Sequence, residues 1–141
     1  MKRNMVVAEW SRAREALRAA ETLTRDRCYA DAISRAYYAI LHAAKAALHV
    51  HDVAAESHAA VRRMFGLHLV KPGDIEPKWS AYLVESLDDR LAADYDVETF
   101  FSNEEARSEC RRTREFLGRV KRYLLKNGLK EAELRKGHRE Q

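Results

Sequence analysis

The segment 36–50 limits the possible folds more than any other part of the chain. Every residue in it is apolar except His42, Lys45 and His49. The apolar periodicity predicts a helix from about residue 29 to about residue 50. A helix that is apolar on nearly all of its sides has to be buried nearly all round. We therefore expect this helix to lie inside the fold.

The rest of the chain has the pattern of further amphipathic helices. Only two prolines and five glycines punctuate the sequence, and no stretch alternates in the manner of a strand. Ser102 followed by Glu105 is a capping box that begins a helix, and Asn127 with Gly128 ends it. We expect four other helices, near residues 6–20, 57–69, 77–95 and 102–124.

Helices of this length joined by short turns are best buried side by side. We therefore predict an all-α fold, namely an antiparallel up-and-down four-helix bundle in which 57–69 is one additional short helix. The predicted bundle spans residues 1–128. Residues 129–141 are mostly charged, so we expect a flexible C-terminal tail.

Composition excludes several classes of function. The longest unbroken apolar run, 36–41, is far shorter than a membrane span, so we expect a cytoplasmic protein with no membrane partner. The two cysteines, Cys28 and Cys110, form no metal-binding motif and are expected to be reduced. Six histidines include no HExxH, and no phosphate-binding glycine loop occurs, so no metal and no cofactor are expected. The net charge of +4 permits an anionic partner such as RNA or a nucleotide.

A polar seam runs along the helix predicted at 29–50. It follows alternating spacings of three and four residues, so its members share one face of the helix. The seam is either the solvated side of a central helix or the lining of a cleft in which a phosphate meets Arg35 and a hydroxyl meets His42. Its members are Arg35, Tyr38, His42, Lys45 and His49.

Ionisable residues also continue the apolar stripe of the helix at 77–95. Arg90 and Asp94 are four residues apart and are expected to pair with each other or with a neighbouring helix. Tyr95 lies about 140° round the helix from Arg90 and need not share its partners. The helix at 102–124 carries a basic outer face that could contact an RNA backbone or could simply be solvated. That face contains Arg111, Arg112, Arg114, Arg119, Lys121 and Arg122.

Three segments resemble the HEPN family of small helical proteins. Residues 32–48 read AISRAYYAILHAAKAAL and carry the most specific likeness. Ser57 with His58, then Phe65 and the turn at 70–73, is similar to the middle helix and turn of the family. Residues 90–95, RLAADY, are similar to its RxxxDY element. The resemblance runs from about Trp10 to about Leu124.

The resemblance implies a helical bundle that usually forms a homodimer and is often encoded beside a minimal nucleotidyltransferase. Many members are metal-independent RNases that act as toxins and use an Arg-x(4–6)-His motif. Arg35 and His42 are separated by six residues and satisfy that spacing. In catalytic members the motif generally lies on a later helix, where this chain has Arg90, Asp94 and Tyr95 instead.

Two principal functions follow from the resemblance. One is an RNA-directed toxin, or RNase-like component of a toxin-antitoxin pair, with Arg35, His42 and Arg90 as catalytic candidates. Tyr38, Lys45, Asp94 and Tyr95 are then the binding candidates. The other is a non-catalytic nucleotide- or RNA-binding subunit that forms a complex with a nucleotidyltransferase. A small-nucleotide or substrate-recruiting module is a third possibility.

Overall fold

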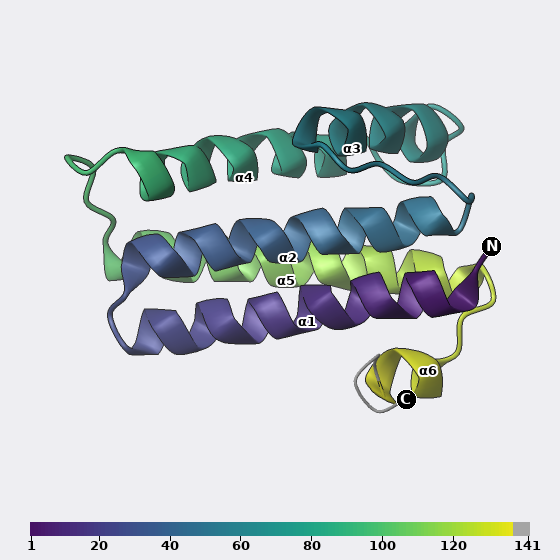
Figure 1. Cartoon of the computed structure of the whole chain (residues 1–141), viewed down its shortest axis with the longest axis horizontal. Coiled ribbons are helices and arrows are strands. Elements are labelled where there is room, and N and C mark those ends of the chain that lie inside the picture. Colours follow the sequence, from purple (N-terminus) through teal and green to yellow (C-terminus); the bar gives the residue numbers. More distant parts are fainter. Residues whose placement is uncertain (137–141) are drawn as a thin grey trace.

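Residues 1–136 of the chain are described by this computed structural model, and within them every regular element is helical (Figure 1). The all-α class is therefore confirmed. In chain order the elements are α1 (Arg3–Arg25), α2 (Tyr29–His49), α3 (His58–Phe65), the π-helical turn η1 (Gly66–Val70), α4 (Lys78–Tyr95), α5 (Asn103–Lys126) and α6 (Glu131–Lys136).

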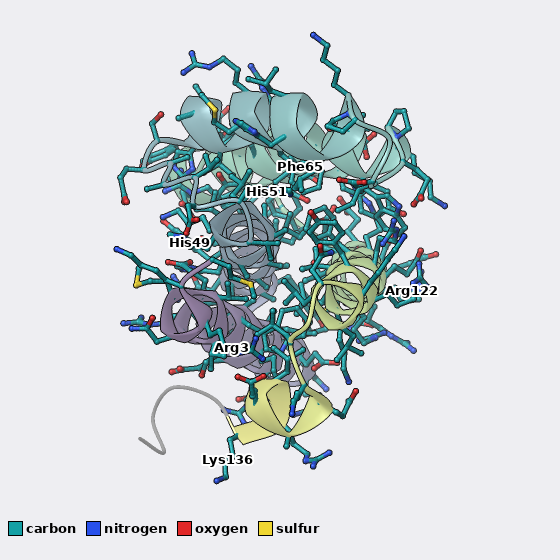
Figure 2. The ribbon with its side chains drawn as sticks, turned by 90° about the vertical axis from the view of Figure 1, so that its right-hand side faces the viewer. Arg3, His49, His51, Phe65, Arg122 and Lys136 are labelled. Atoms are coloured by element: carbon teal, nitrogen blue, oxygen red, sulfur yellow. The ribbon has the colours of Figure 1, made fainter. Side chains whose placement is uncertain are left out.

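Helix α2 lies at the centre of the molecule. It packs most extensively on α1 and also on α5 and α4. The view along the helices in Figure 2 shows α2 between α1 on one side and the layer of α3 and α4 on the other, with α5 beside it. The prediction that α2 is buried nearly all round is confirmed, because 13 of its 21 residues are buried.

Small side chains explain the close packing of α1 against α2. Helices approach most closely where the side chains between them are small. Helix α1 buries Ala13, Ala16 and Ala20, and α2 buries seven alanines, among them Ala39 and Ala43. The alanine-rich composition of α2 therefore determines which helix becomes its nearest neighbour.

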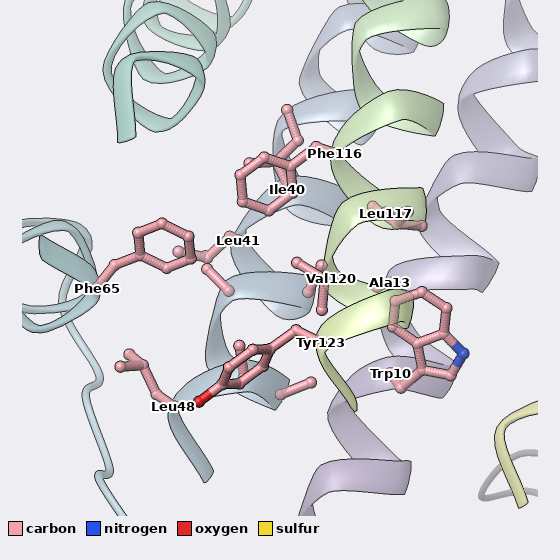
Figure 3. Close-up of a cluster of buried hydrophobic side chains, with 14 of the residues drawn as sticks. Trp10, Ala13, Ile40, Leu41, Leu48, Phe65, Phe116, Leu117, Val120 and Tyr123 are labelled. Atoms are coloured by element: carbon pink, nitrogen blue, oxygen red, sulfur yellow. The ribbon is translucent and has the colours of Figure 1, made fainter. Parts of the chain in front are cut away.

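Larger side chains fill the space between α2, α5 and the α3–α4 layer. Figure 3 shows Phe65 of α3 reaching toward Leu41 of α2, while Phe116 of α5 lies beside Ile40. Phe65 and Phe116 are stacked, with ring centres 5.9 Å apart. Trp79 meets the edge of Phe116 at 6.1 Å. These rings join α3 and α4 to α5 although α4 has only limited backbone contact with α5.

Helix α6 lies within the segment 129–141, for which we expected a flexible tail. Leu129 and Leu134 are buried in the main core cluster, and α6 packs on α1. Arg3, which Figure 2 shows on the side of α1 that faces α6, donates to Glu133 and to the Gly128 carbonyl oxygen. Leu129 and Leu134 are five residues apart among charged ones, so they show no helical periodicity in the sequence. Residues 137–141 of the expected tail lie outside the described part of the chain.

The finer expectation of an up-and-down four-helix bundle with one additional short helix stays a prediction. The four long helices alternate in direction along the chain (Figure 1). However, α2 and α5 pack directly on each other, and α6 is a second short helix. The capping box at Ser102 and Glu105 is confirmed by both of its hydrogen bonds. No helix within residues 1–136 is long and apolar enough to cross a membrane.

The docking of α6 makes a testable contribution to stability. Leu134 is only 1% exposed, so Leu134→Ala should lower the free energy of unfolding by about 2 to 3 kcal/mol through lost burial and the cavity that remains. Urea denaturation followed by circular dichroism measures the change. Lys136→Ala, an exposed change in the same helix, is the control and should stay within about 0.5 kcal/mol of the wild type. Equal stabilities for all three proteins would mean that α6 is not docked.

Candidate functional site

Over residues 32–49, the polar seam is the one side of α2 that neighbouring helices leave uncovered. Tyr38, His42, Lys45 and His49 are partly exposed and Arg35 is exposed, whereas the residues between them are buried. The first part of the seam lines an open hollow of about 290 Å³ between α1 and α2. Its lining from α2 is Arg35, Tyr38 and His42, and its lining from α1 is Arg12, Glu15, Ala16 and Ala19. Arg35 and His42 therefore share one surface depression.

His42 has a carboxylate partner that sequence reasoning missed. Its Nδ1 lies 2.8 Å from Oε2 of Glu9, a residue of α1. Burial works to raise the pKa of Glu9, but the hydrogen bond to His42 and the charges of His42, Lys45 and His49 lower it overall. An ionised Glu9 fixes Nδ1 of His42 as the donor. His42 Nε2 makes no hydrogen bond within residues 1–136, so it is left to accept a proton.

Lys45 lies apart from the hollow. Its Nζ is 3.8 Å from Oε2 of Glu56, in the segment that leads to α3. Lys45 is not among the residues that line the depression with Arg35 and His42. Lys45 thus lies outside the depression, as does His49, although the charges of both act on Glu9.

Tyr38 connects the seam to α4. The guanidinium carbon of Arg35 lies 4.7 Å from the centre of the Tyr38 ring. On the other side, Nη2 of Arg90 donates to the Tyr38 hydroxyl at 3.0 Å. Two of the catalytic candidates, from different helices, therefore meet on one tyrosine.

Arg90 is engaged on every side by aromatic and acidic groups. The predicted pair with Asp94 is present, with Nε of Arg90 2.9 Å from Oδ2 of Asp94, although Nε is not aligned for a hydrogen bond. The guanidinium also lies over the rings of Tyr37 and Tyr38, at 5.7 and 5.4 Å. Such contacts hold the side chain in one orientation.

Tyr95 lies near Arg90 although the two are about 140° apart around the helix. Its ring centre lies 5.9 Å from Cζ of Arg90, so the two residues do interact. The 140° between their Cα positions is bridged because both side chains are long. Tyr95 is otherwise one of the most exposed aromatic residues of the described chain.

A buried contact beneath Arg90 attaches α3 to α2. The hydroxyl of Tyr37 bonds to Nδ1 of His58. Burial, together with the charges of Arg90 and Lys45, lowers the pKa of His58, so the neutral ring accepts this hydrogen bond. Burial also raises the pKa of Tyr37 to about 12. His58 is therefore a structural acceptor, as expected for a boundary histidine.

Arg112 holds the part of α4 that carries Arg90. It contacts Glu109 and Glu85 at 2.6 Å each and Asp89 at 3.8 Å, and so joins α5 to α4. The basic outer face predicted for α5 is thus largely neutralised. Arg114 pairs with Glu21, Arg119 with Glu76, and Lys121 with Glu131.

Arg35 and Arg90 both contact Tyr38, and Arg90 pairs in turn with Asp94. Arg35 and His42 line the same hollow. Glu9 and Arg12 were missed because their relevance depends on how α1 is aligned against α2. A position of Glu9 beside the apolar stripe of α1 is the only hint in the sequence. Among the described residues no group of three or more side chains is arranged to hold a metal ion.

Comparison with known proteins identifies the family of the chain. The HEPN domain family matches residues 7–123. Putative toxin MJ0605 of Methanocaldococcus jannaschii is 39% identical over 112 residues, which cover 79% of this chain and 83% of that protein. Putative toxin MJ0142 of the same organism is 32% identical over 120 residues, covering 84% and 82%. UPF0332 protein PH1297 of Pyrococcus horikoshii is 48% identical over 60 residues, covering 43% and 42%.

The Arg90–Asp94 pair should contribute to stability before it contributes to function. The side chains are 13% and 26% exposed, between a buried and a surface ion pair. Asp94→Ala should therefore lower the free energy of unfolding by about 1 to 3 kcal/mol. Thermal and urea denaturation measure the loss. Asp88→Ala, an exposed residue of the same helix, is the control and should change stability by less than about 0.5 kcal/mol. Normal stability of the Asp94 variant combined with lost activity would reverse the order of the two roles.

Proposed function

Because the chain belongs to the HEPN family, we propose that it is an RNA-directed toxin that cleaves RNA without a metal ion. The observation that carries the proposal is the α1–α2 hollow, where Arg35 and a carboxylate-oriented His42 line the same depression. The two M. jannaschii relatives named as toxins support the toxin role.

The chemistry requires a base and a cation. Nε2 of His42 takes the proton of a ribose 2′-hydroxyl, and the 2′-oxygen forms a bond to the adjacent phosphorus. The bond from phosphorus to the 5′-oxygen breaks, and that oxygen takes a proton from water. The products are a 2′,3′-cyclic phosphate and a 5′-hydroxyl.

Two other groups support this reaction. Arg35 stabilises the negative charge that develops on the phosphate oxygens. Glu9 keeps His42 in the required tautomer and stabilises the imidazolium that forms, as a carboxylate partner does for other catalytic histidines.

Arg90 favours a second function. It is engaged by Tyr38, Asp94 and the ring of Tyr37, so it acts in the fold as a support for Tyr38. Within residues 1–136 no histidine contacts Arg90 by hydrogen bond or ion pair. A chain of this kind also suits a non-catalytic nucleotide- or RNA-binding subunit of a nucleotidyltransferase complex, in which the same hollow binds a phosphate without cleaving it.

We expect the chain to form a homodimer through the region where α4 ends. Leu91, Tyr95, Val97 and Phe100 are exposed there, and exposed apolar side chains that cluster favour association. Light scattering should give about twice the monomer mass of 16.3 kDa. Val97→Asp with Phe100→Asp should shift the protein to monomer without unfolding it. A monomeric wild type over a wide concentration range would contradict the expectation.

Cleavage of RNA separates the two functions. His42→Ala should reduce the cleavage rate about a hundredfold or more with little change in binding, because a general base acts mainly in the transition state. Arg35→Ala should weaken both binding and rate, since a phosphate-binding cation acts in both states. Cleavage should persist in EDTA and leave a 2′,3′-cyclic phosphate end.

The control for this assay is His68→Ala, a partly exposed histidine outside the hollow. It should cleave like the wild type. If the wild type cleaves no more than the His42→Ala protein, the nuclease proposal fails and the binding-subunit function takes its place.

A further inference from the structure

Several arginines without an ion pair lie along α1 and on the neighbouring first half of α5. Arg12, Arg18, Arg107 and Arg111 make no ion pair and no hydrogen bond in the part of the chain that the structure describes, and Arg25 contacts only the Thr22 hydroxyl. Arg111 belongs to the basic face predicted on α5, but four of the six cations of that face are paired.

A second hollow lies between the end of α1 and the start of α5. Its volume is about 500 Å³. Four arginines line it, and the only carboxylate in the lining is Glu21, which already pairs with Arg114 at 2.7 Å. The arginines are Arg25, Arg107, Arg111 and Arg114.

A third hollow connects this one to the hollow at His42. It lies on the outer side of α1 and is lined by Arg18. It shares Glu15 and Ala19 with the hollow at His42, and it shares Glu21 and Arg25 with the hollow at α5. The three depressions therefore adjoin one another around α1, from the seam of α2 to the first turns of α5, and together are called the path.

The path holds more positive charge than the rest of the molecule. Its lining contains seven arginines and two glutamates, a net charge of +5, whereas the whole chain has +4. Not every hollow on this molecule has such an excess of positive charge. A depression of about 520 Å³ at the other end of α5 has three cations and two acids, and its Arg119 is paired with Glu76.

Unpaired cations so close together repel one another, and an anionic ligand removes that cost. We propose that the path binds the phosphodiester backbone of single-stranded RNA and leads it to the hollow at His42. This inference rests on the proposed function in one respect, namely that the same RNA strand enters that hollow. Arg107 and Arg111 would bind phosphates well away from the reacting bond.

The spacing of the arginines favours an extended ligand over a compact one. Arg12, Arg18 and Arg25 follow one another at six or seven residues, which is about 10 Å of rise along α1. A free phosphate or a mononucleotide would fill one hollow only. A strand with a regularly repeated charge can engage all three hollows.

Binding of labelled RNA tests the proposal directly. Single-stranded RNA of about twelve nucleotides and a dinucleotide are titrated with wild type and with the Arg107→Gln/Arg111→Gln variant, at several salt concentrations, by fluorescence anisotropy. The variant should bind the long RNA about tenfold more weakly, and its salt slope should fall by about 1.4, because each phosphate contact contributes about 0.7. Binding of the dinucleotide should not change.

The matched control is Arg62→Gln/Arg63→Gln on α3, where two exposed arginines line none of the three hollows. This control should bind both RNAs like the wild type. If both double variants lose equal affinity for the long RNA, or if the Arg107→Gln/Arg111→Gln variant loses none, the proposed path is wrong.

The assay needs no cleavage, so it stays informative if the nuclease proposal fails. A length-dependent loss with no cleavage by the wild type would keep the RNA path and reject catalysis. If cleavage depends on His42 but the Arg107→Gln/Arg111→Gln variant binds the long RNA like the wild type, the nuclease proposal stands and the path is wrong.

Discussion

The burial of α2 on all sides except one is the constraint on which the other features of the molecule depend. Its alanines allow α1 to approach closely, and its larger residues pack against α5 and the α3–α4 layer. Polar side chains on such a helix can avoid the cost of burial only by sharing the remaining side. Arg35, Tyr38 and His42 therefore come together for reasons of packing, and the hollow beside α1 is a consequence of that arrangement.

Charged side chains in this protein have two distinct roles. Arg112 and Arg90 are paired with acids or held over aromatic rings, and they fix α4 against α5 and α2. The arginines around α1 have few such partners and leave a positive path on the surface. Breaking a partly buried ion pair between helices lowers the stability of the fold. Unpaired surface arginines contribute little to stability. The second group is thus free to serve binding.

Sequence reasoning succeeded where the relevant contacts are local or periodic. The capping box of Ser102 and Glu105, the seam of α2 and the pairing of Arg90 with Asp94 all depend on spacings within one helix. It failed where two distant segments meet. The Glu9–His42 contact depends on the alignment of α1 with α2, and the docking of Leu134 depends on an apolar site that α1 offers. The basic face of α5 was predicted from that helix alone. Acidic residues of α1, α4 and the segment before α4 form ion pairs with its arginines.

The central claim is that the exposed side of α2 forms a binding hollow with α1 and does not serve merely as a solvated surface. A nuclear magnetic resonance titration of isotope-labelled protein with a ribodinucleotide tests it most directly, because side-chain signals of arginine and histidine report contact even without cleavage. Signals of Arg35, His42 and Arg12, which line the hollow, should shift progressively, whereas signals of Arg62 on α3 should not change. Shifts confined to residues outside the hollow, or no shifts at saturating dinucleotide, would contradict the claim.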